Sequence, residues 1–380
     1  MVMPTESNSR DEFSQDIGAA RIGISINELQ SPYYGAIADG ALLYLKERGV
    51  NAIVHLTAHL RTGELEAWEL VRNKHFDSCL VHSDHLSDEE LSVLMGEHTN
   101  VVLLNRRVPG FYDRCVSTDC SAGGAMAALY LLKNGHTELA VVGGPFSHTH
   151  TSLRTNGFMQ TLNNWNQELP EPLILESDFT ELGGALAMEE ILDHTRNISA
   201  VFFHSDEMAV GALEYCCRNK ILVPQSISVI GFDGLKIGQF VTPKLTTIKQ
   251  PLRMIGRESG RLAMDLIDPS IDSEKINVGN TVFVPALMEG NSVRSLGQLD
   301  QMVRLTRREK ECLEWSAHGK TAWEVGRILG ISVRTVNNHL SNSFKRLGVT
   351  NRSEAIAKSI REGLIAVSYT HLTLPTICSV

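Results

Sequence analysis

The stretch that decides the organisation of this chain runs from Leu305 to Ile365: LTRREKECLEWSAHGKTAWEVGRILGISVRTVNNHLSNSFKRLGVTNRSEAIAKSIREGLI. It contains three helix-start signals, each a capping side chain followed three residues later by a Glu that can reach back to the free backbone amides. The pairs are Thr306 with Glu309, Thr321 with Glu324, and Asn351 with Glu354. Helices commonly end at a glycine in the left-handed conformation. The glycines at such positions are Gly319, Gly330, Gly348 and Gly363.

These signals predict four short helices, at about 306–318, 321–329, 332–347 and 351–362. Short helices joined by tight turns are typical of the helix-turn-helix arrangement, which places one helix in the DNA major groove. The third helix has an apolar stripe made of Val336, Leu340, Phe344 and Leu347. Its other face is polar, with Arg334, Thr335, Asn337, Asn338, Ser341, Asn342 and Lys345.

The polar face has the chemistry of a DNA-reading surface. Asn can bond bidentately to adenine, and Arg to guanine or phosphate. Lys320, Thr335 and Lys345 are better placed for phosphate contacts. Between Arg304 and Ala366, 12 Lys/Arg face 6 Asp/Glu, a net charge of +6, whereas the whole chain carries −9. A basic module on an acidic body suits local phosphate binding, although a solvated helical bundle would show the same pattern.

The composition indicates a globular protein. A chain of 380 residues allows two or three domains, with 43% hydrophobic and 21% charged residues. The polar N-terminus lacks the features of a secretory signal, and no apolar run is long enough to cross a membrane, so we expect a cytoplasmic protein. Seven cysteines without a CxxC pair predict neither a disulfide framework nor a zinc site, and Cys216 and Cys217 are expected to be buried.

Strands and helices alternate from Arg21 onward. RIGISI, AIVHLT, SCLVHS, VVLLN, ELAVVGG, LILES, AVFFHS and SVIGFD are short apolar segments separated by amphipathic ones. This pattern predicts an α/β fold of two lobes, each a doubly wound parallel sheet covered on both faces. Residues 1–20 are expected to be disordered, and 291–303 to form a linker. The segment 367–380 fits no fold and has the character of an artefactual tail.

The C-terminal stretch resembles the LuxR-type helix-turn-helix domain. The resemblance rests on LTRREKECL, GKTAWEV, ILGISVRTVNNHLSNSFKRL and NRSEAIA, and it covers all four predicted helices of 304–366. It implies that Asn337, Asn338 and Ser341 face the bases. It also implies that the fourth helix pairs two subunits, giving a homodimer on double-stranded DNA. Gly326 departs from the family, which usually has Ala there.

Residues 21–290 resemble the effector-binding domain of LacI/GalR regulators, a type I periplasmic-binding-protein fold. SPYYGAI, VVLLNRRVPGFYDRCVSTD, LLKNGH, LRTNGF, DEMAVGAL, VPQSISVIGFD and PKLTTIKQP carry the resemblance. It implies three crossings between the lobes and a small sugar-like effector between them. The first lobe would comprise 21–119 and 251–277, and the second 120–249 and 281–290.

The resemblance places seven residues at the effector site: Tyr33, Asn105, Arg154, Phe179, Ser205, Asp233 and Gln250. Arg154, expected to open a helix, and Asp233 could bond sugar hydroxyls. Their alternatives are a surface salt bridge for Arg154 and helix capping for Asp233. Asn105 and Gln250 could instead serve strand ends, and the two aromatic rings could be core.

Two departures from the family concern specificity. Ser205-Asp206 stands where Asn-Asp is usual, and GFDG, with Gly234, replaces GFDD or GYDD. Both remove hydrogen-bonding groups near the cleft, so the resemblance does not fix galactose as the sugar. His148 and His150 in FSHTHTS are expected to be exposed loop residues, and we predict no metal and no cofactor.

The leading hypothesis is a ligand-responsive transcription regulator. Only about 20 residues precede the first strand, too few for the N-terminal DNA-binding domain of LacI/GalR proteins. The main alternative is a cytosolic sugar-binding sensor that does not act on DNA. A response regulator would need an acidic pair after RIGISI, and an acyl-homoserine-lactone receptor has a smaller sensor. A transport protein would need a signal peptide. We find no GxSxG, P-loop or paired-carboxylate motif in the sequence, so the sequence does not favour an enzyme.

Overall fold

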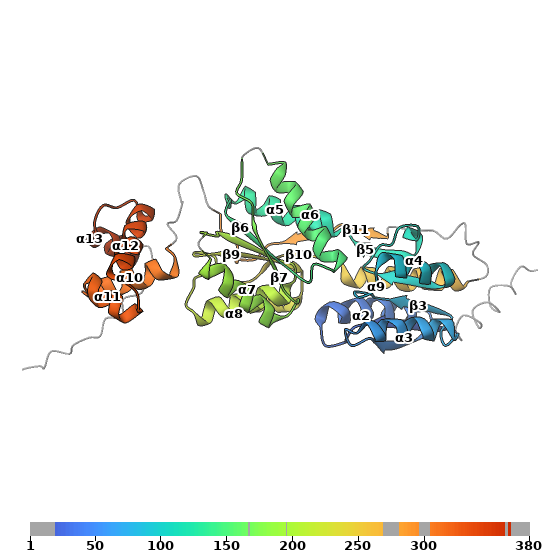
Figure 1. Ribbon diagram of the computed structural model, residues 1–380. Helices are drawn as coiled ribbons and strands as arrows, with labels where there is room; N and C mark the ends of the chain where they lie inside the picture. Colours follow the sequence, from blue (N-terminus) through green and yellow to red (C-terminus); the bar gives the residue numbers. More distant parts are fainter. Residues whose placement is uncertain are drawn as a thin grey trace, which may run out of the picture.

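A computed structural model of the chain describes residues 20–165, 168–194, 196–268, 281–295, 305–361 and 364–365. Figure 1 shows two α/β lobes followed by a small helical domain. The predicted disordered segment before Ala20, the linker from 296 to 303 and the tail 367–380 lie outside the described residues. None of the described helices is long and apolar enough to cross a membrane.

The first lobe has a parallel sheet in the order β11-β5-β4-β3-β1-β2. Helices α2 and α9 cover one face of it, and α3 and α4 the other. Its elements are β1 (Arg21–Ile26), α2 (Pro32–Lys46), β2 (Asn51–Leu56), α3 (Arg61–Arg72), β3 (Ser78–Val81), α4 (Asp88–Glu97), β4 (Val101–Leu104), η1 (Tyr112–Arg114), β5 (Cys115–Thr118), α9 (Leu252–Ile267) and β11 (Val282–Phe283).

The second lobe has a sheet in the order β12-β10-β9-β8-β6-β7, parallel except for β12, which runs antiparallel to β10. Helices α5 and α6 cover one face, and α7 and α8 the other. Its elements are α5 (Cys120–Lys133), β6 (Leu139–Gly143), α6 (Thr149–Asn163), β7 (Leu173–Glu176), α7 (Glu181–Asp193), β8 (Ala200–Phe203), α8 (Asp206–Arg218), β9 (Ser228–Asp233), η2 (Lys236–Gln239), β10 (Thr246–Lys249) and β12 (Ala286–Met288).

Strand β8 illustrates why these apolar segments form central strands. Val201 and Phe203 pack among the core residues under α7 and α8, whereas Ala200 and Phe202 pack under α5 and α6. Successive side chains of a strand point to opposite faces, so a continuous apolar run suits a sheet covered on both sides. The predicted α/β class with two doubly wound lobes is confirmed.

The chain crosses between the lobes three times, as the resemblance implied: from β5 to α5, from β10 to α9 and from β11 to β12. The predicted division between lobes differs at one point. β11 pairs with β5 and so completes the sheet of the first lobe, whereas 281–290 was assigned to the second. Strand β5 was not predicted, because CVST is short and follows a Pro/Gly-containing loop.

Residues Asn291–Val293 belong to the second lobe rather than to a linker. Ser292 is fully buried, and its hydroxyl donates to the Val229 carbonyl (2.6 Å) and accepts from the Thr246 amide (2.8 Å). Val293 packs against the core beneath α5 and α6. These contacts hold the segment to β9 and β10.

The prediction for the two adjacent cysteines is half wrong, since Cys216 is buried and Cys217 exposed.

The helical domain contains α10 (Arg307–Ala317), α11 (Ala322–Leu329), α12 (Val333–Leu347) and α13 (Arg352–Arg361), as predicted. Capping boxes begin α10 at Thr306 and α11 at Thr321. At the start of α13, Asn351 accepts from the Glu354 amide (2.9 Å), but the Glu354 carboxylate accepts from the Thr350 amide instead of closing a box. The caps fix where each helix begins, and a shared apolar core holds the helices together.

Candidate functional site

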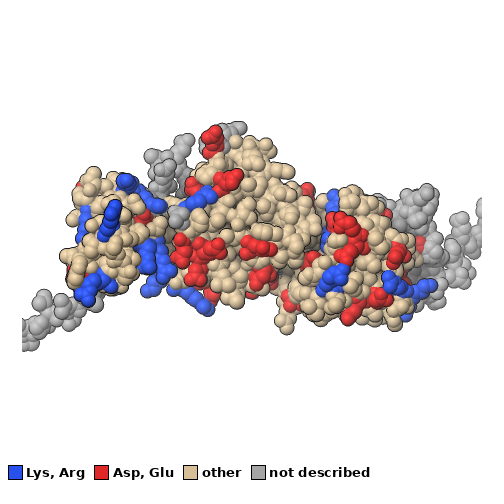
Figure 2. Space-filling model, in the orientation of Figure 1, with Lys and Arg blue, Asp and Glu red and all other residues tan. Residues whose placement is uncertain are grey.

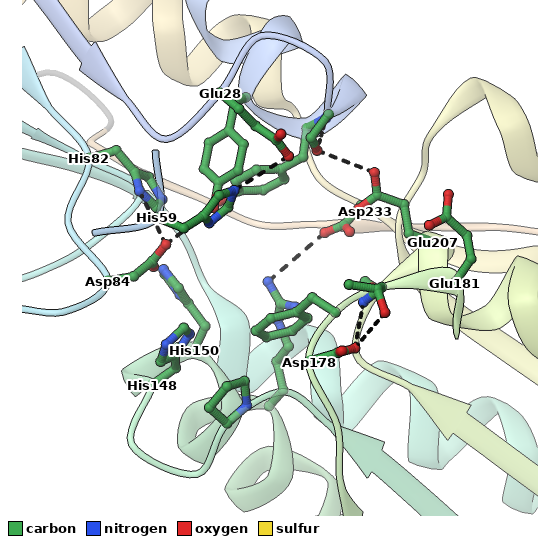
Figure 3. Close-up of a pocket in the computed structure, with 18 residues that line it drawn as sticks. Glu28, His59, His82, Asp84, His148, His150, Asp178, Glu181, Glu207 and Asp233 are labelled. Carbon is green, nitrogen blue, oxygen red and sulfur yellow. Dashed lines mark hydrogen bonds and ion pairs between the residues drawn. The ribbon is translucent and has the colours of Figure 1, made fainter. Parts of the chain in front are cut away.

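A cavity of about 250 Å³ lies between the two lobes (Figure 3). It lies beyond the carboxyl ends of strands, where open α/β sheets bind ligands. The first lobe lines it with Glu28, Ser31, Tyr33, Tyr34, His59, His82 and Asp84. The second lobe lines it with Pro145, His148, His150, Arg154, Asp178, Phe179, Thr180, Glu181, Ser205, Glu207 and Asp233. A ligand in this cavity therefore contacts both lobes.

Arg154 and Asp233 form the buried ion pair of the cavity, with Nη2 and Oδ1 4.0 Å apart. Another nitrogen of the guanidinium, Nη1, donates to the His204 carbonyl, and the group lies 3.9 Å from the centre of the Phe232 ring. Helix α6 begins at Thr149, so Arg154 lies in its second turn and does not open the helix as predicted. These contacts hold the guanidinium rigidly, and its buried Nε has no hydrogen-bond partner among the described residues.

Asn105 and Gln250 do not line the cavity; they support residues that do. Asn105, with a backbone φ of +50°, donates to the Tyr33 hydroxyl (2.5 Å) and to Oε1 of Gln250 (3.3 Å). Gln250 in turn donates to Oδ1 of Asp233 (2.7 Å). Asn105 also accepts from the Thr118 amide (2.9 Å). The chain of bonds fixes Tyr33 of the first lobe and Asp233 of the second.

Ser205 and Phe179 line the cavity but also have structural contacts. Ser205 caps α8, accepting from the Met208 amide (3.1 Å). Phe179 has a backbone φ of +65° and lies against Gly144, where a Cβ would be 2.0 Å from the ring. Its ring is 5.9 Å from that of His148. Gly144 thus makes room for an aromatic side chain at the cavity.

The lining contains many charged and imidazole groups that the sequence did not single out. Figure 3 shows His82, Asp84, His148 and His150 together, away from Glu181, Glu207 and Asp233. The prediction that His148 and His150 are exposed loop residues is wrong. His148 stands at the N-cap position of α6 without a side-chain capping hydrogen bond, and His150 lies within that helix. Both side chains line the cavity and are half-buried. Their FSHTHTS segment follows the carboxyl end of β6, a position that could have been recognised as part of the site.

Burial shifts the pKa values of several groups in the cavity. It raises the pKa of Asp233 to about 6 against the opposing effect of Arg154. Burial and the neighbouring carboxylates of Asp233 and Glu181 raise the pKa of Glu207 to about 7. Burial together with the charge of Arg154 lowers the pKa of His150 to about 3. These shifts leave His150 uncharged at neutral pH and Glu207 only partly ionised.

Gly234, which replaces the second Asp of the family pattern, has a structural reason. Its φ is +73°, and a Cβ there would lie 2.5 Å from Cγ and 2.8 Å from Cα of Lys249. An Asp at this position would need a different path of the β9–η2 connection. The neighbouring Asp206 is fully buried and accepts from the Leu235 amide (2.6 Å) and the Thr247 hydroxyl (2.5 Å). Asp206 therefore stabilises this connection and does not line the cavity.

The helical domain presents the predicted polar face of α12 to solvent. Residues Arg334, Asn337, Asn338, Ser341, Asn342 and Lys345 are exposed on it. Thr335 is half-buried, and its hydroxyl lies 2.8 Å from that of the capping Ser332. Lys320 precedes α11 with Nζ 3.7 Å from Glu324. The opposite face of α12 is buried through Val336, Leu340 and Leu347.

The helical domain and the lobes differ in the charge of their surfaces. Figure 2 shows Lys and Arg spread over the helical domain and clusters of Asp and Glu on the lobes.

Gly326, the departure from the LuxR pattern, lies where the turn after α11 approaches the helix. A Cβ there would be 2.8 Å from the Ile331 carbonyl oxygen. The close approach explains why this chain has glycine inside a helix.

Comparisons with known proteins match both parts of the chain. Residues 128–293 match the family described as "Periplasmic binding protein-like domain", and residues 303–359 that described as "Bacterial regulatory proteins, luxR family". The regulator GalS of Salmonella typhimurium is 29% identical over 272 residues, which cover 72% of this chain and 79% of GalS. The ribose operon repressor of Escherichia coli is 29% identical, covering 71% of this chain and 81% of the repressor.

A solved structure gives the same assignment. The crystal structure of a LacI-family transcriptional regulator from "Burkhoderia phymatum" matches with a TM-score of 0.65 and 28% identity, covering 72% of this chain and 99% of that one. The chain therefore carries a LacI/GalR-like effector domain and a LuxR-type helix-turn-helix domain, which confirms both resemblances. It is a ligand-responsive DNA-binding transcription regulator rather than a sensor without DNA binding. The relatives named are regulators, not enzymes.

Proposed function

We propose that the effector is an uncharged sugar-class molecule bound between the lobes and that its binding changes how α12 engages DNA. The observation that carries the proposal is the cavity itself, which joins two lobes and combines a fixed arginine with carboxylates and aromatic rings. Such a combination suits polyhydroxylated ligands, whose hydroxyls both donate and accept while their ring faces stack. The ribose operon repressor among the relatives supports the same class.

The charge of the lining argues against an anionic effector. Six carboxylate side chains but one guanidinium line the cavity. A phosphorylated or carboxylated ligand would meet more negative than positive groups in a site of low dielectric. A neutral sugar can donate hydroxyl hydrogens to Asp233 and Glu207 while Arg154 donates to its oxygens. Tyr33 and Phe179 supply the apolar surfaces, and Ser205 adds a hydroxyl to the lining. Asn105 holds Tyr33 in place, and Gln250 holds Asp233.

Ligand binding controls DNA binding only if the two conformations of the lobes bind the ligand with different affinity. A ligand that touches both lobes favours the closed form, and closure changes how two subunits pair. A homodimer then sets the spacing between its two reading helices. On double-stranded DNA, Asn337, Asn338 and Ser341 read bases, while Lys320, Arg334, Thr335 and Lys345 contact phosphates. We place such a regulator in the cytoplasm.

Calorimetry of the full chain against a panel of hexoses and pentoses tests the effector class. Asp233→Asn keeps the shape of the side chain and removes its charge, so we expect it to weaken the best ligand about 10-fold or more. Arg154→Ala should also abolish binding, with its fold checked by circular dichroism because the guanidinium packs on Phe232. Control Glu214→Gln on the exposed side of α8 should bind normally. Unchanged affinity in Asp233→Asn would contradict the cavity assignment.

Gel shifts with the chain's own upstream DNA test the output. Binding should weaken steeply with salt, because phosphate contacts release counterions. Asn338→Ala should weaken binding to this DNA while leaving weak nonspecific binding unchanged. The sugar that binds in calorimetry should change the midpoint of the gel shift; a sugar that binds without any effect on DNA affinity would contradict the proposed coupling.

A further inference from the structure

One cluster in the cavity has the composition of a metal site. His82, Asp84 and His150 bring a potential ligand atom each to within 4.8 Å of one another. Nδ1 of His82 lies 3.6 Å from Oδ2 of Asp84. Tetrahedral coordination with Zn–N and Zn–O bonds of roughly 2.0–2.2 Å keeps ligand atoms about 3.4 Å apart. One pair already has this spacing, and a small approach of the third residue completes the set.

The three residues come from both lobes. His82 and Asp84 follow β3 in the first lobe, whereas His150 lies in the first turn of α6 in the second. Figure 3 shows the three side chains grouped on one side of the cavity. An ion bound by all three would tie the lobes together, and closure of the lobes would bring His150 nearer to the other two. The affinity of this cluster for an ion therefore depends on the relative position of the lobes.

The imidazole nitrogens are available to a ligand. His82 is 2% exposed, yet its Nδ1 has no hydrogen-bond partner among the described residues. The buried Nε2 of His150 likewise has no partner there. Buried polar atoms without partners cost about 1–3 kcal/mol each, so their presence needs an explanation. A bound cation would satisfy both.

The surrounding residues orient the cluster as second-layer partners do in metal sites. Nδ1 of His150 lies 3.5 Å from Sγ of Cys120, so a proton on Nδ1 leaves Nε2 free to coordinate. Oδ2 of Asp84 accepts from the side-chain Nδ2 of Asn27 (2.8 Å) and from the Tyr34 hydroxyl (3.2 Å). Asn27 is held in turn by the Thr57 hydroxyl, which donates to Oδ1 (2.5 Å). Asp84 is thereby fixed in the orientation that faces the histidines.

The donor set selects the kind of ion. Two imidazoles and one carboxylate suit Zn²⁺ and its first-row neighbours, whereas Mg²⁺ and Ca²⁺ prefer oxygen ligands. Three protein ligands leave a fourth position open, as in sites where the ion contacts a small molecule. Because the cluster lines the effector cavity, that position faces the ligand.

From this geometry we infer that His82, Asp84 and His150 bind one divalent transition-metal ion, Zn²⁺ in type, which bridges the lobes and offers its open position to an oxygen of the effector. The inference rests on the proposed function only in taking this cavity as the effector site. In this proposal the metal ion and the hydroxyl-rich effector bind side by side in the cavity between the two lobes.

Titration of the full chain with ZnCl₂ by calorimetry, after treatment with a chelator and dialysis, tests the site. We expect one high-affinity ion per chain. Asp84→Asn, which is isosteric, and His150→Asn should each weaken it at least about 10-fold, since loss of even second-layer partners costs roughly that much. His75→Ala, an exposed histidine far from the cluster in sequence, should bind as the parent does. Near-ultraviolet circular dichroism verifies that each variant is folded.

Replacement of Zn²⁺ by Co²⁺ gives a second readout, because a tetrahedral Co²⁺ site produces strong visible absorption that should disappear in both variants. Absence of high-affinity binding by the parent chain, or equal binding by the parent and the two variants, overturns the inference. Sugar titrations with and without Zn²⁺ separate the two proposals. Sugar binding in a chain that binds no metal leaves the proposed function intact, whereas metal binding without any sugar binding overturns the sugar class alone.

Discussion

Glu207 should make the stability of the effector domain depend on pH in a defined direction. Its carboxylate is partly buried near Asp233 and accepts from the Ser31 hydroxyl of the other lobe (3.3 Å). Burial raises its pKa from 4.5 to about 7. Between these values the folded chain binds more protons at this site than the unfolded chain does. The stabilisation is therefore fully present below pH 4.5 and is lost as pH rises through 7.

The magnitude follows from the size of the shift. A difference of about 2.5 pKa units at 1.36 kcal/mol each sets a ceiling of roughly 3 kcal/mol. The group is half-buried, so solvent screening reduces the expected effect to about 1–2 kcal/mol. Glu207→Gln cannot ionise, yet it retains an oxygen that can accept from Ser31. The variant should equal the parent near pH 4.5 and exceed its stability by about 1–2 kcal/mol at pH 8.

Urea unfolding of the effector domain, followed at both pH values, measures this difference. Comparison of the variant with the parent at each pH removes contributions that do not involve residue 207. The repulsion between Glu207 and Asp233 belongs to the measured difference, because the Asp233 carboxylate helps to raise the pKa of Glu207. Glu214→Gln, on the same helix but exposed and paired with Arg218 at 2.5 Å, serves as the matched control and should show no such growth with pH. A stability difference for Glu207→Gln that is the same at both pH values would refute the assignment of a raised pKa.

Three further predictions concern the helical domain. Asn338→Ala should weaken operator binding about 10-fold or more in competition gel shifts, because a bidentate base contact contributes roughly 1–3 kcal/mol; an equal loss on unrelated DNA would mean that Asn338 reads no base. Gly326→Ala should destabilise this domain by about 1 kcal/mol in thermal unfolding, since overpacking against the Ile331 carbonyl outweighs the better helix propensity of alanine; stabilisation would contradict this explanation. Thr321→Ala should cost about 1 kcal/mol by opening a capping box, and Thr321→Ser should restore most of it.

The helical domain could be predicted almost completely because its signals are local. Thr306 and Thr321 each form the box that their spacing with Glu309 and Glu324 predicts. Gly330 and Gly348 take the left-handed conformation at the ends of α11 and α12. A cap or a helix end depends on residues within one turn, so the sequence contains the whole cause.

The cavity was predicted less well because its members depend on long-range contacts. Asn105 and Gln250 follow strands, where ligand-binding residues are expected. Their side chains nevertheless bond to each other, and Gln250 bonds to Asp233, rather than lining the cavity. Position at a strand end does not tell whether a side chain turns toward a ligand or toward a neighbouring strand. His150 was missed for the opposite reason. A segment that looks like a surface loop becomes part of the site only when the other lobe covers it.

The same network suggests how the cavity communicates with the rest of the molecule. Gln250 lies on the crossing from β10 to α9, so its backbone belongs to the hinge between lobes. Its side chain accepts from Asn105 at the end of β4 and donates to Asp233 at the end of β9. A ligand that forms a hydrogen bond with Asp233 would therefore compete with the bond that Gln250, at the hinge, donates to Asp233. The energy for a conformational change can come only from different affinities in the two states. We therefore propose that Gln250 links occupancy of the cavity to closure of the lobes through these hydrogen bonds.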